Sequence, residues 1–147
     1  MARYVHLEIE ATDGAGDLRA ALLLRVRGTI VLDWRLTPLA ASALELARAA
    51  TGDHAAGAPP LFGDADFSVS HDGDAVTLAG FRGCAVPPDA RFQVPWSALA
   101  GAAIRLGDYT VRRSNAAAGA WRDELRALLR PIRARRRTLM RAAGRPG

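Results

Sequence analysis

Short segments in which every second residue is apolar place the strongest constraint on the fold of this chain. Segments 5–10, 22–27 and 30–36 share this alternation, which is typical of β-strands with one buried face. Arg27 and Gly28 separate the second segment from the third and predict a tight turn. In the third segment, the alternation predicts an inward-facing row made of Ile30, Leu32, Trp34 and Leu36.

A helix signal follows the third strand. Thr37 and Pro38 match an N-cap followed by proline at the first helical position. The alanine-rich segment after them runs to Gly52, a residue suited to end a helix.

The same order of patterns recurs in the second half of the chain. Two strands are predicted around residues 67–79 and a third at 91–96, followed by a helix from Ser97 to Gly107. Residues 108–113 then predict an edge strand, and a further helix begins at about residue 116.

These elements predict an α+β fold with a mainly antiparallel sheet, in the order βββα-βββα plus a basic C-terminal helix. Residues 1–115 form the predicted body, and 116–147 form an amphipathic, then arginine-rich, C-terminal helix or tail. The helical segments 37–47 and 97–107 resemble each other, so 1–52 and 61–107 are possible βββα quasi-repeats.

The stretch FSVSHDGDAVTLAG, residues 67–80, predicts a β-hairpin with Asp72 and Gly73 in its turn. That turn pairs His71 with Asp74 and Val69 with Val76. It also sorts the hairpin into an apolar face and a polar face, as a sheet with one buried face needs. The apolar face is Phe67, Val69, Val76 and Leu78, and the polar face includes Ser68, Ser70 and Thr77.

This stretch also holds a serine, a histidine and two aspartates close together, which raises the possibility of a catalytic or metal site. Neighbouring residues of a strand point to opposite faces, however, so Ser70 and His71 do not meet as nucleophile and base. The acidic residues lack the spacing of a calcium loop. With a single cysteine, Cys84, interpreted as an apolar filler, we assign no catalytic, metal or cofactor-binding residue. The three tryptophans are interpreted as core residues.

Charge divides the chain into two unequal parts. Residues 1–110 hold nine arginines against thirteen acidic residues, a net charge of −4, whereas 111–147 hold eleven arginines against two, a net charge of +9. All twenty basic residues are arginine. Because a GC-rich bacterial genome accounts for an excess of arginine, the placement of these residues is more informative than their number.

The C-terminal segment carries the clearest candidate binding surface. Apolar residues from Trp121 to Ile132 form one stripe of an amphipathic helix, which we expect to dock on the body. Pro131 is expected to kink or interrupt this helix. Beyond it, five arginines are predicted to bind a partner: Arg133, Arg135, Arg136, Arg137 and Arg141.

We therefore expect a small non-enzymatic binding or adaptor protein that engages a macromolecular partner through its sheet or its basic C-terminal helix. The expected partner is another protein or a second copy of the chain. Two alternatives stay open: sequence-independent nucleic-acid binding through the arginine-rich tail, and an enzyme whose site combines distant residues. The charged N-terminal segment lacks a signal-peptide pattern, and the most apolar run, 20–24, is too short to span a bilayer. We expect a cytoplasmic location, no integral membrane association and no cofactor.

Overall fold

The computed structural model describes residues 4–11, 18–55, 59–114 and 119–143. It confirms the α+β fold and the order βββα-βββα plus a C-terminal helix. The elements are β1 (Val5–Ala11), β2 (Arg19–Val26), β3 (Thr29–Pro38), α1 (Leu39–Thr51), β4 (Asp66–Asp72), β5 (Ala75–Arg82), β6 (Phe92–Pro95), α2 (Trp96–Arg113) and α3 (Ala120–Ala142). The strands form two antiparallel sheets in the orders β1-β2-β3 and β4-β5-β6.

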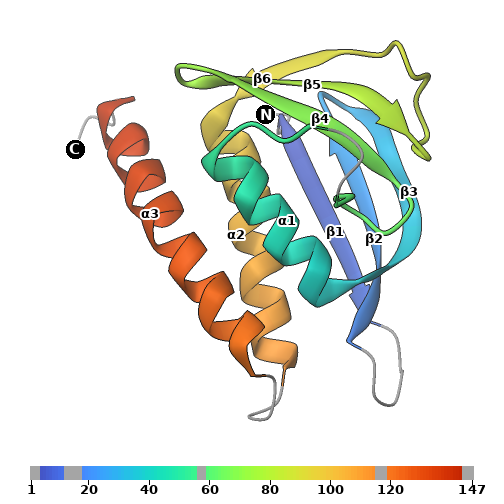
Figure 1. Ribbon diagram of the computed structural model, residues 1–147. Helices are drawn as coiled ribbons and strands as arrows, with labels where there is room; N and C mark the ends of the chain where they lie inside the picture. The colour runs from blue at the N-terminus through green and yellow to red at the C-terminus, as the bar shows by residue number, and fades with distance from the viewer. Residues whose placement is uncertain (1–3, 12–17, 56–58, 115–118, 144–147) are drawn as a thin grey trace.

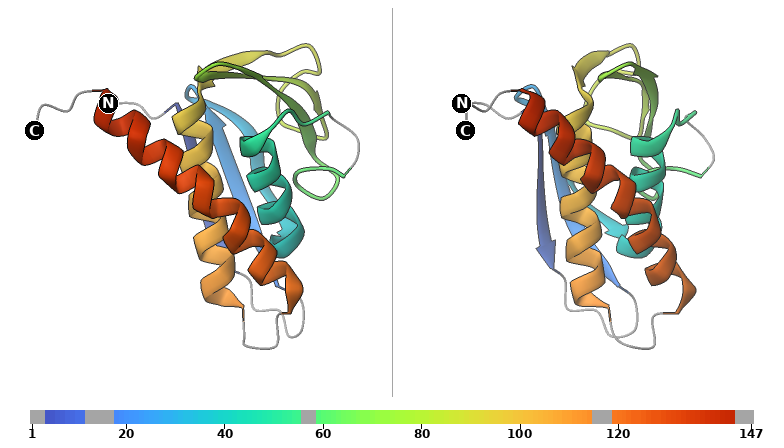
Figure 2. Two further views of the ribbon diagram at one scale, coloured as in Figure 1. Left: turned by 60° about the vertical axis from the view of Figure 1, so that its left-hand side comes forward. Right: turned by 90° about the vertical axis from the view of Figure 1, so that its left-hand side faces the viewer.

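Two helices cover one face of the β1–β3 sheet (Figure 1). Helices α1 and α2 pack against each other and lie beside the β1–β3 sheet, while the β4–β6 sheet lies across their ends. Helix α3 packs on α1 and α2, on the side away from the β1–β3 sheet (Figure 2). Apolar side chains from both sheets and all three helices join in one continuous core.

Aromatic residues anchor the junction between the second sheet and the helices. The rings of Phe67 and Phe81 lie 5.3 Å apart in the core, and both side chains are buried. Trp96, which is also buried, donates a hydrogen bond from Nε1 to the carbonyl oxygen of Ala50 at 2.7 Å. This bond satisfies one of the carbonyls at the end of α1 and holds α1 against the start of α2.

Of the predicted inward face of β3, only Leu32 is fully buried. Ile30 is half-buried beside a fully buried Val31, and Trp34 and Leu36 are exposed. Leu24 is opposite Leu32, but Leu22 is opposite Arg35, so two residues of β3 stand against one residue of β2. This irregularity interrupts the alternation. Trp34 adopts a φ of 43° and is 43% exposed, and Leu36 is 52% exposed. Trp34 is therefore not a core residue, in contrast to Trp96, and Trp121 is half-buried.

The start of α1 also differs from the prediction. Thr37 and Pro38 belong to the end of β3, and the helix begins at Leu39 with Pro38 as its N-cap. Thr37 is fully buried, and its hydroxyl makes no hydrogen bond to another described residue, so it does not cap the helix. The predicted end is confirmed, because Gly52 follows the last helical residue.

The β4–β5 hairpin forms with the predicted faces but in a different register. Gly73 and Asp74, rather than Asp72 and Gly73, make the two-residue turn, and Gly73 has a φ of 63°. A glycine with positive φ at the first turn position fits a type II′ hairpin. Val69 is consequently opposite Leu78, and His71 is opposite Val76 instead of Asp74. The shift is two residues, so the alternation survives and Phe67, Val69, Val76 and Leu78 are all buried.

Residues 108–113 form the last turns of α2 and not the predicted edge strand. Helix α2 continues past Gly107, which lies at the contact between α2 and α3. A Cβ atom at Gly107 would lie 2.6 Å from Cδ1 of Leu129 in α3, so glycine permits the close approach of the two helices. None of the described helices combines the length and the apolar character that crossing a membrane requires.

Candidate functional site

Helix α3 is amphipathic, and its apolar face fixes how its arginines are presented. Leu125, Leu129 and Ile132 recur at helical spacing and are buried against α1 and α2. The helix runs through Pro131 without interruption, contrary to the expectation. Pro131 and Ala127, whose carbonyl loses its amide partner to the proline, are both exposed. Water can therefore satisfy that carbonyl, while the buried leucine and isoleucine hold the helix on both sides.

Three of the five arginines predicted to bind a partner make contacts within the chain. Arg133 forms an ion pair with Asp108 of α2. Arg136 donates from Nε to the carbonyl oxygen of Ser97 at 3.1 Å. Arg135 donates to the carbonyl oxygen of Gly73 at 3.1 Å and lies over the ring of Trp96, 3.9 Å from its centroid. These contacts fasten α3 antiparallel to α2 and to the hairpin tip.

The other two predicted residues, Arg137 and Arg141, are exposed. Neither forms an ion pair with any residue that the structure describes. They lie along a groove between α2 and α3 with three further exposed arginines, which also form no ion pair within the part of the chain that the structure describes. We call these five residues the rim arginines: Arg112, Arg126, Arg130, Arg137 and Arg141.

The groove consists of two successive hollows that share Arg133, and we call it the arginine groove. The first hollow has a volume of about 470 Å³ and includes Val111 and Leu129 among its lining residues. The second has a volume of about 420 Å³ and includes Ile104 and Met140. Apolar side chains thus lie beside the arginines in both hollows.

Positive charge dominates the arginine groove. Among the described residues that line it, Asp108 is the only acidic one, and it already pairs with Arg133. The two acidic residues of α3, Asp123 and Glu124, lie near its N-terminal end, where the helix dipole favours them. Glu124 pairs there with Arg48 of α1, and this hydrogen-bonded contact raises the pKa of Arg48. The rim arginines are left without counter-charges in the described structure, so an anionic ligand would relieve their mutual repulsion.

Ser68 and His71 of the hairpin make structural hydrogen bonds. His71 Nε2 lies 2.8 Å from the carbonyl oxygen of Ala49 at the end of α1, so this nitrogen carries a proton and donates it. The backbone N–H of His71 donates to Asp53 at 2.7 Å. Ser68 donates from Oγ to the carbonyl oxygen of Ala79 at 3.0 Å. The hairpin therefore caps α1 with His71 and leaves no serine paired with it as nucleophile.

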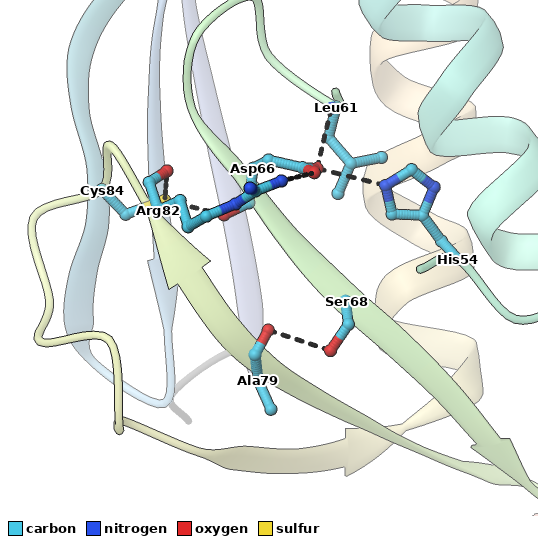
Figure 3. A network of polar contacts seen from close by, with 7 residues as sticks. All are labelled: His54, Leu61, Asp66, Ser68, Ala79, Arg82 and Cys84. Carbon is cyan, nitrogen blue, oxygen red and sulfur yellow. Dashed lines mark hydrogen bonds and ion pairs between the residues drawn. The ribbon is translucent and has the colours of Figure 1, made fainter. Parts of the chain in front are cut away.

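A second polar cluster, around Asp66, was not predicted from the sequence (Figure 3). The buried Asp66 carboxylate accepts a hydrogen bond from the backbone N–H of Leu61 at 3.0 Å and lies 3.1 Å from Nε2 of the buried His54. Arg82 lies 3.6 Å from its other oxygen. His54 and Leu61 follow α1, whereas Asp66 begins β4 and Arg82 ends β5, so the cluster holds His54 and Leu61 against the β4–β5 hairpin. The described residues include no group of three or more metal-ligating side chains that could hold an ion.

Cys84 lies beside this cluster as a half-buried thiol. Its Sγ is 3.5 Å from the carbonyl oxygen of Asp66 and 3.4 Å from that of Arg82. Burial raises the pKa of the Cys84 thiol, which lowers the fraction present as the reactive thiolate. The expectation that Cys84 is a filler agrees with this environment.

No protein-family model, curated protein or solved structure matches the chain. The arginine groove is the feature of the described surface with the most distinctive chemistry. Sequence reasoning found two of its rim arginines and missed Arg112, Arg126 and Arg130. The signal for the last two was present, because residues 126, 130, 133, 137 and 141 are spaced by three or four positions and lie on one face of a helix.

Proposed function

We propose that this protein is a non-enzymatic binding protein that engages an acidic segment of another protein along the arginine groove. The observation that carries the proposal is the row of unpaired rim arginines beside apolar side chains. Guanidinium groups are suited to carboxylates, because they donate several hydrogen bonds in a planar fork. Met140, which is 50% exposed, adds a flexible apolar contact that a purely electrostatic surface does not need.

Nucleic acid is the second candidate ligand. The arginines from Arg126 to Arg141 form a row about 22 Å long, at about 1.5 Å per helical residue. Such a row can track several phosphates of one strand. Two features favour a protein over nucleic acid. Apolar residues contribute to both hollows, and the described lining includes no aromatic side chain on which bases could stack.

The proposal is tested by binding of a fluorescent acidic peptide of about twenty residues, rich in Glu and Leu, to the full-length chain. Loss of two charges in Arg137→Gln/Arg141→Gln is expected to weaken binding by up to about thirtyfold, since each exposed ion pair contributes up to about 1 kcal/mol. The matched control, Arg27→Gln/Arg91→Gln, removes the same charge from exposed positions outside the groove. Equal losses in both double variants would show that net charge, and not the groove, attracts the peptide.

A duplex DNA of about twenty base pairs serves as the competing probe. If the duplex binds tightly and the peptide does not, the second candidate replaces the first. Its affinity should then fall with salt at a log–log slope of about −0.9 per phosphate contacted. A peptide held partly by apolar contacts is expected to show a shallower dependence.

A further inference from the structure

We infer that the segment bound in the arginine groove is an acidic amphipathic α-helix, which lies between α2 and α3. This inference rests on the proposed function and names the form of the partner. Its apolar stripe faces Ile104, Val111 and Met140, and its carboxylates face the rim arginines.

The walls of the groove decide between a helical and an extended occupant. Every described residue that lines the two hollows belongs to α2 or α3. Both walls are helices, so along the residues that the structure describes the groove offers side chains and not a strand edge. An extended segment would leave backbone N–H and C=O groups unpaired against apolar side chains, which is costly, whereas a helix satisfies its own backbone.

The dimensions of the groove agree with a helix. Its two hollows follow one another along the α2–α3 interface, with Arg133 between them. On α2, Ile104 and Val111 are seven residues apart, which corresponds to about 10 Å or two helical turns. An occupant with large apolar residues at positions i and i+7 can therefore place one of them in each hollow.

The charges of the groove determine which residues should border the apolar stripe of the bound helix. Arg112 lies on the α2 wall of the first hollow, and the other four rim arginines lie on α3 along both hollows. A helix with a narrow apolar stripe, carboxylates along the side that faces α3 and a carboxylate near Arg112 matches this arrangement. A basic or neutral helix would add to the uncompensated positive charge or leave it unrelieved.

The first test compares two peptides of identical composition on the full-length chain. In one, Leu and Glu are ordered to form an acidic amphipathic helix of about twenty residues, and in the other the order is scrambled so that no stripe forms. The ordered peptide is expected to bind about tenfold tighter and to gain helical circular dichroism on binding. Equal affinity of the two peptides, with binding still dependent on Arg137 and Arg141, would overturn the helical occupant and leave the proposed function standing.

The second test removes the apolar contact on the protein side. Met140→Gln is expected to weaken binding of the ordered peptide about fivefold and to leave the scrambled peptide unaffected. Leu36→Gln is the matched control, because Leu36 is 52% exposed, as Met140 is 50% exposed, but lies on β3. An unchanged affinity in Met140→Gln contradicts the inferred docking. Binding of duplex DNA with no binding of either peptide would overturn both this inference and the proposed function.

Discussion

Arg135 illustrates how far a single arginine can depart from the role that its charge suggests. It is one of four arginines within residues 133–137, and its position in the sequence does not distinguish it from Arg137. In the structure it reaches the turn of the β4–β5 hairpin, where it contacts Gly73 and Asp74, and it covers the ring of Trp96. It therefore connects α3 to the second sheet, whereas Arg137 stays available for a ligand.

This difference predicts opposite phenotypes for two neighbouring substitutions. Arg135→Gln should lower the free energy of unfolding by about 1 kcal/mol, through loss of the cation–π contact and the hydrogen bonds. Arg137→Gln should change it by less than about 0.5 kcal/mol, as exposed surface substitutions do. Urea unfolding of the two variants measures both values. A larger destabilisation by Arg137→Gln would mean that the assignment of structural and free arginines is reversed.

At Cys84, the same reasoning gives a prediction about pH. Burial raises the pKa of this thiol, so the folded chain should react with iodoacetamide more slowly than the urea-unfolded chain near pH 8. The rate-versus-pH curve of the folded chain should be displaced to higher pH. Folding raises the pKa of Cys84, so protonation of this thiol contributes to the free energy of unfolding. That contribution is fully present below the pKa of the unfolded chain and is lost as pH rises through the pKa of the folded chain. Faster alkylation of the folded chain would contradict the burial argument.

At the scale of elements, alternation and helical spacing were sufficient to predict the order of strands and helices. They failed where a tertiary contact or a local irregularity overrode the pattern. The irregularity in β3 turns Trp34 and Leu36 to the exposed side, and no period-two rule anticipates it. The sequence predicts that a helix ends at Gly107. The packing role of this glycine cannot be predicted in the same way, because it depends on Leu129, which lies 22 positions away in the sequence.

The two glycines of α2 provide a matched test of that role. Gly107→Ala should destabilise the chain by about 1–3 kcal/mol, because its Cβ would overlap the buried side chain of Leu129. The atoms nearest to a Cβ at Gly101 belong to the guanidinium of Arg136, from 3.2 Å outward, at the end of a flexible side chain. Helix propensity should then make Gly101→Ala neutral or stabilising, by up to about 1 kcal/mol. Thermal unfolding of the two variants measures both changes in stability. Equal destabilisation by the two substitutions would contradict the packing role of Gly107.

At the scale of the whole molecule, the charge asymmetry of the sequence becomes a spatial one. The described acidic residues of the body lie mostly on β-strands and loops, with Glu45 on α1 and Asp108 on α2. Helix α3, which is rich in arginine, packs on the side of α1 and α2 that faces away from the β1–β3 sheet (Figure 2). The sequence could predict that the C-terminal segment was basic and amphipathic. It could not predict the arginine groove, because the groove depends on which residues of α2 lie opposite which residues of α3.

The most direct test of the arginine groove as the binding site is an NMR titration of the full-length chain with the ordered acidic peptide. Chemical-shift changes should concentrate on α2 and α3, at Ile104, Arg112, Arg137 and Met140, with little change on the exposed side of the β1–β3 sheet. Changes confined to that sheet, around Trp34 and Leu36, would contradict the account and place the binding surface there instead.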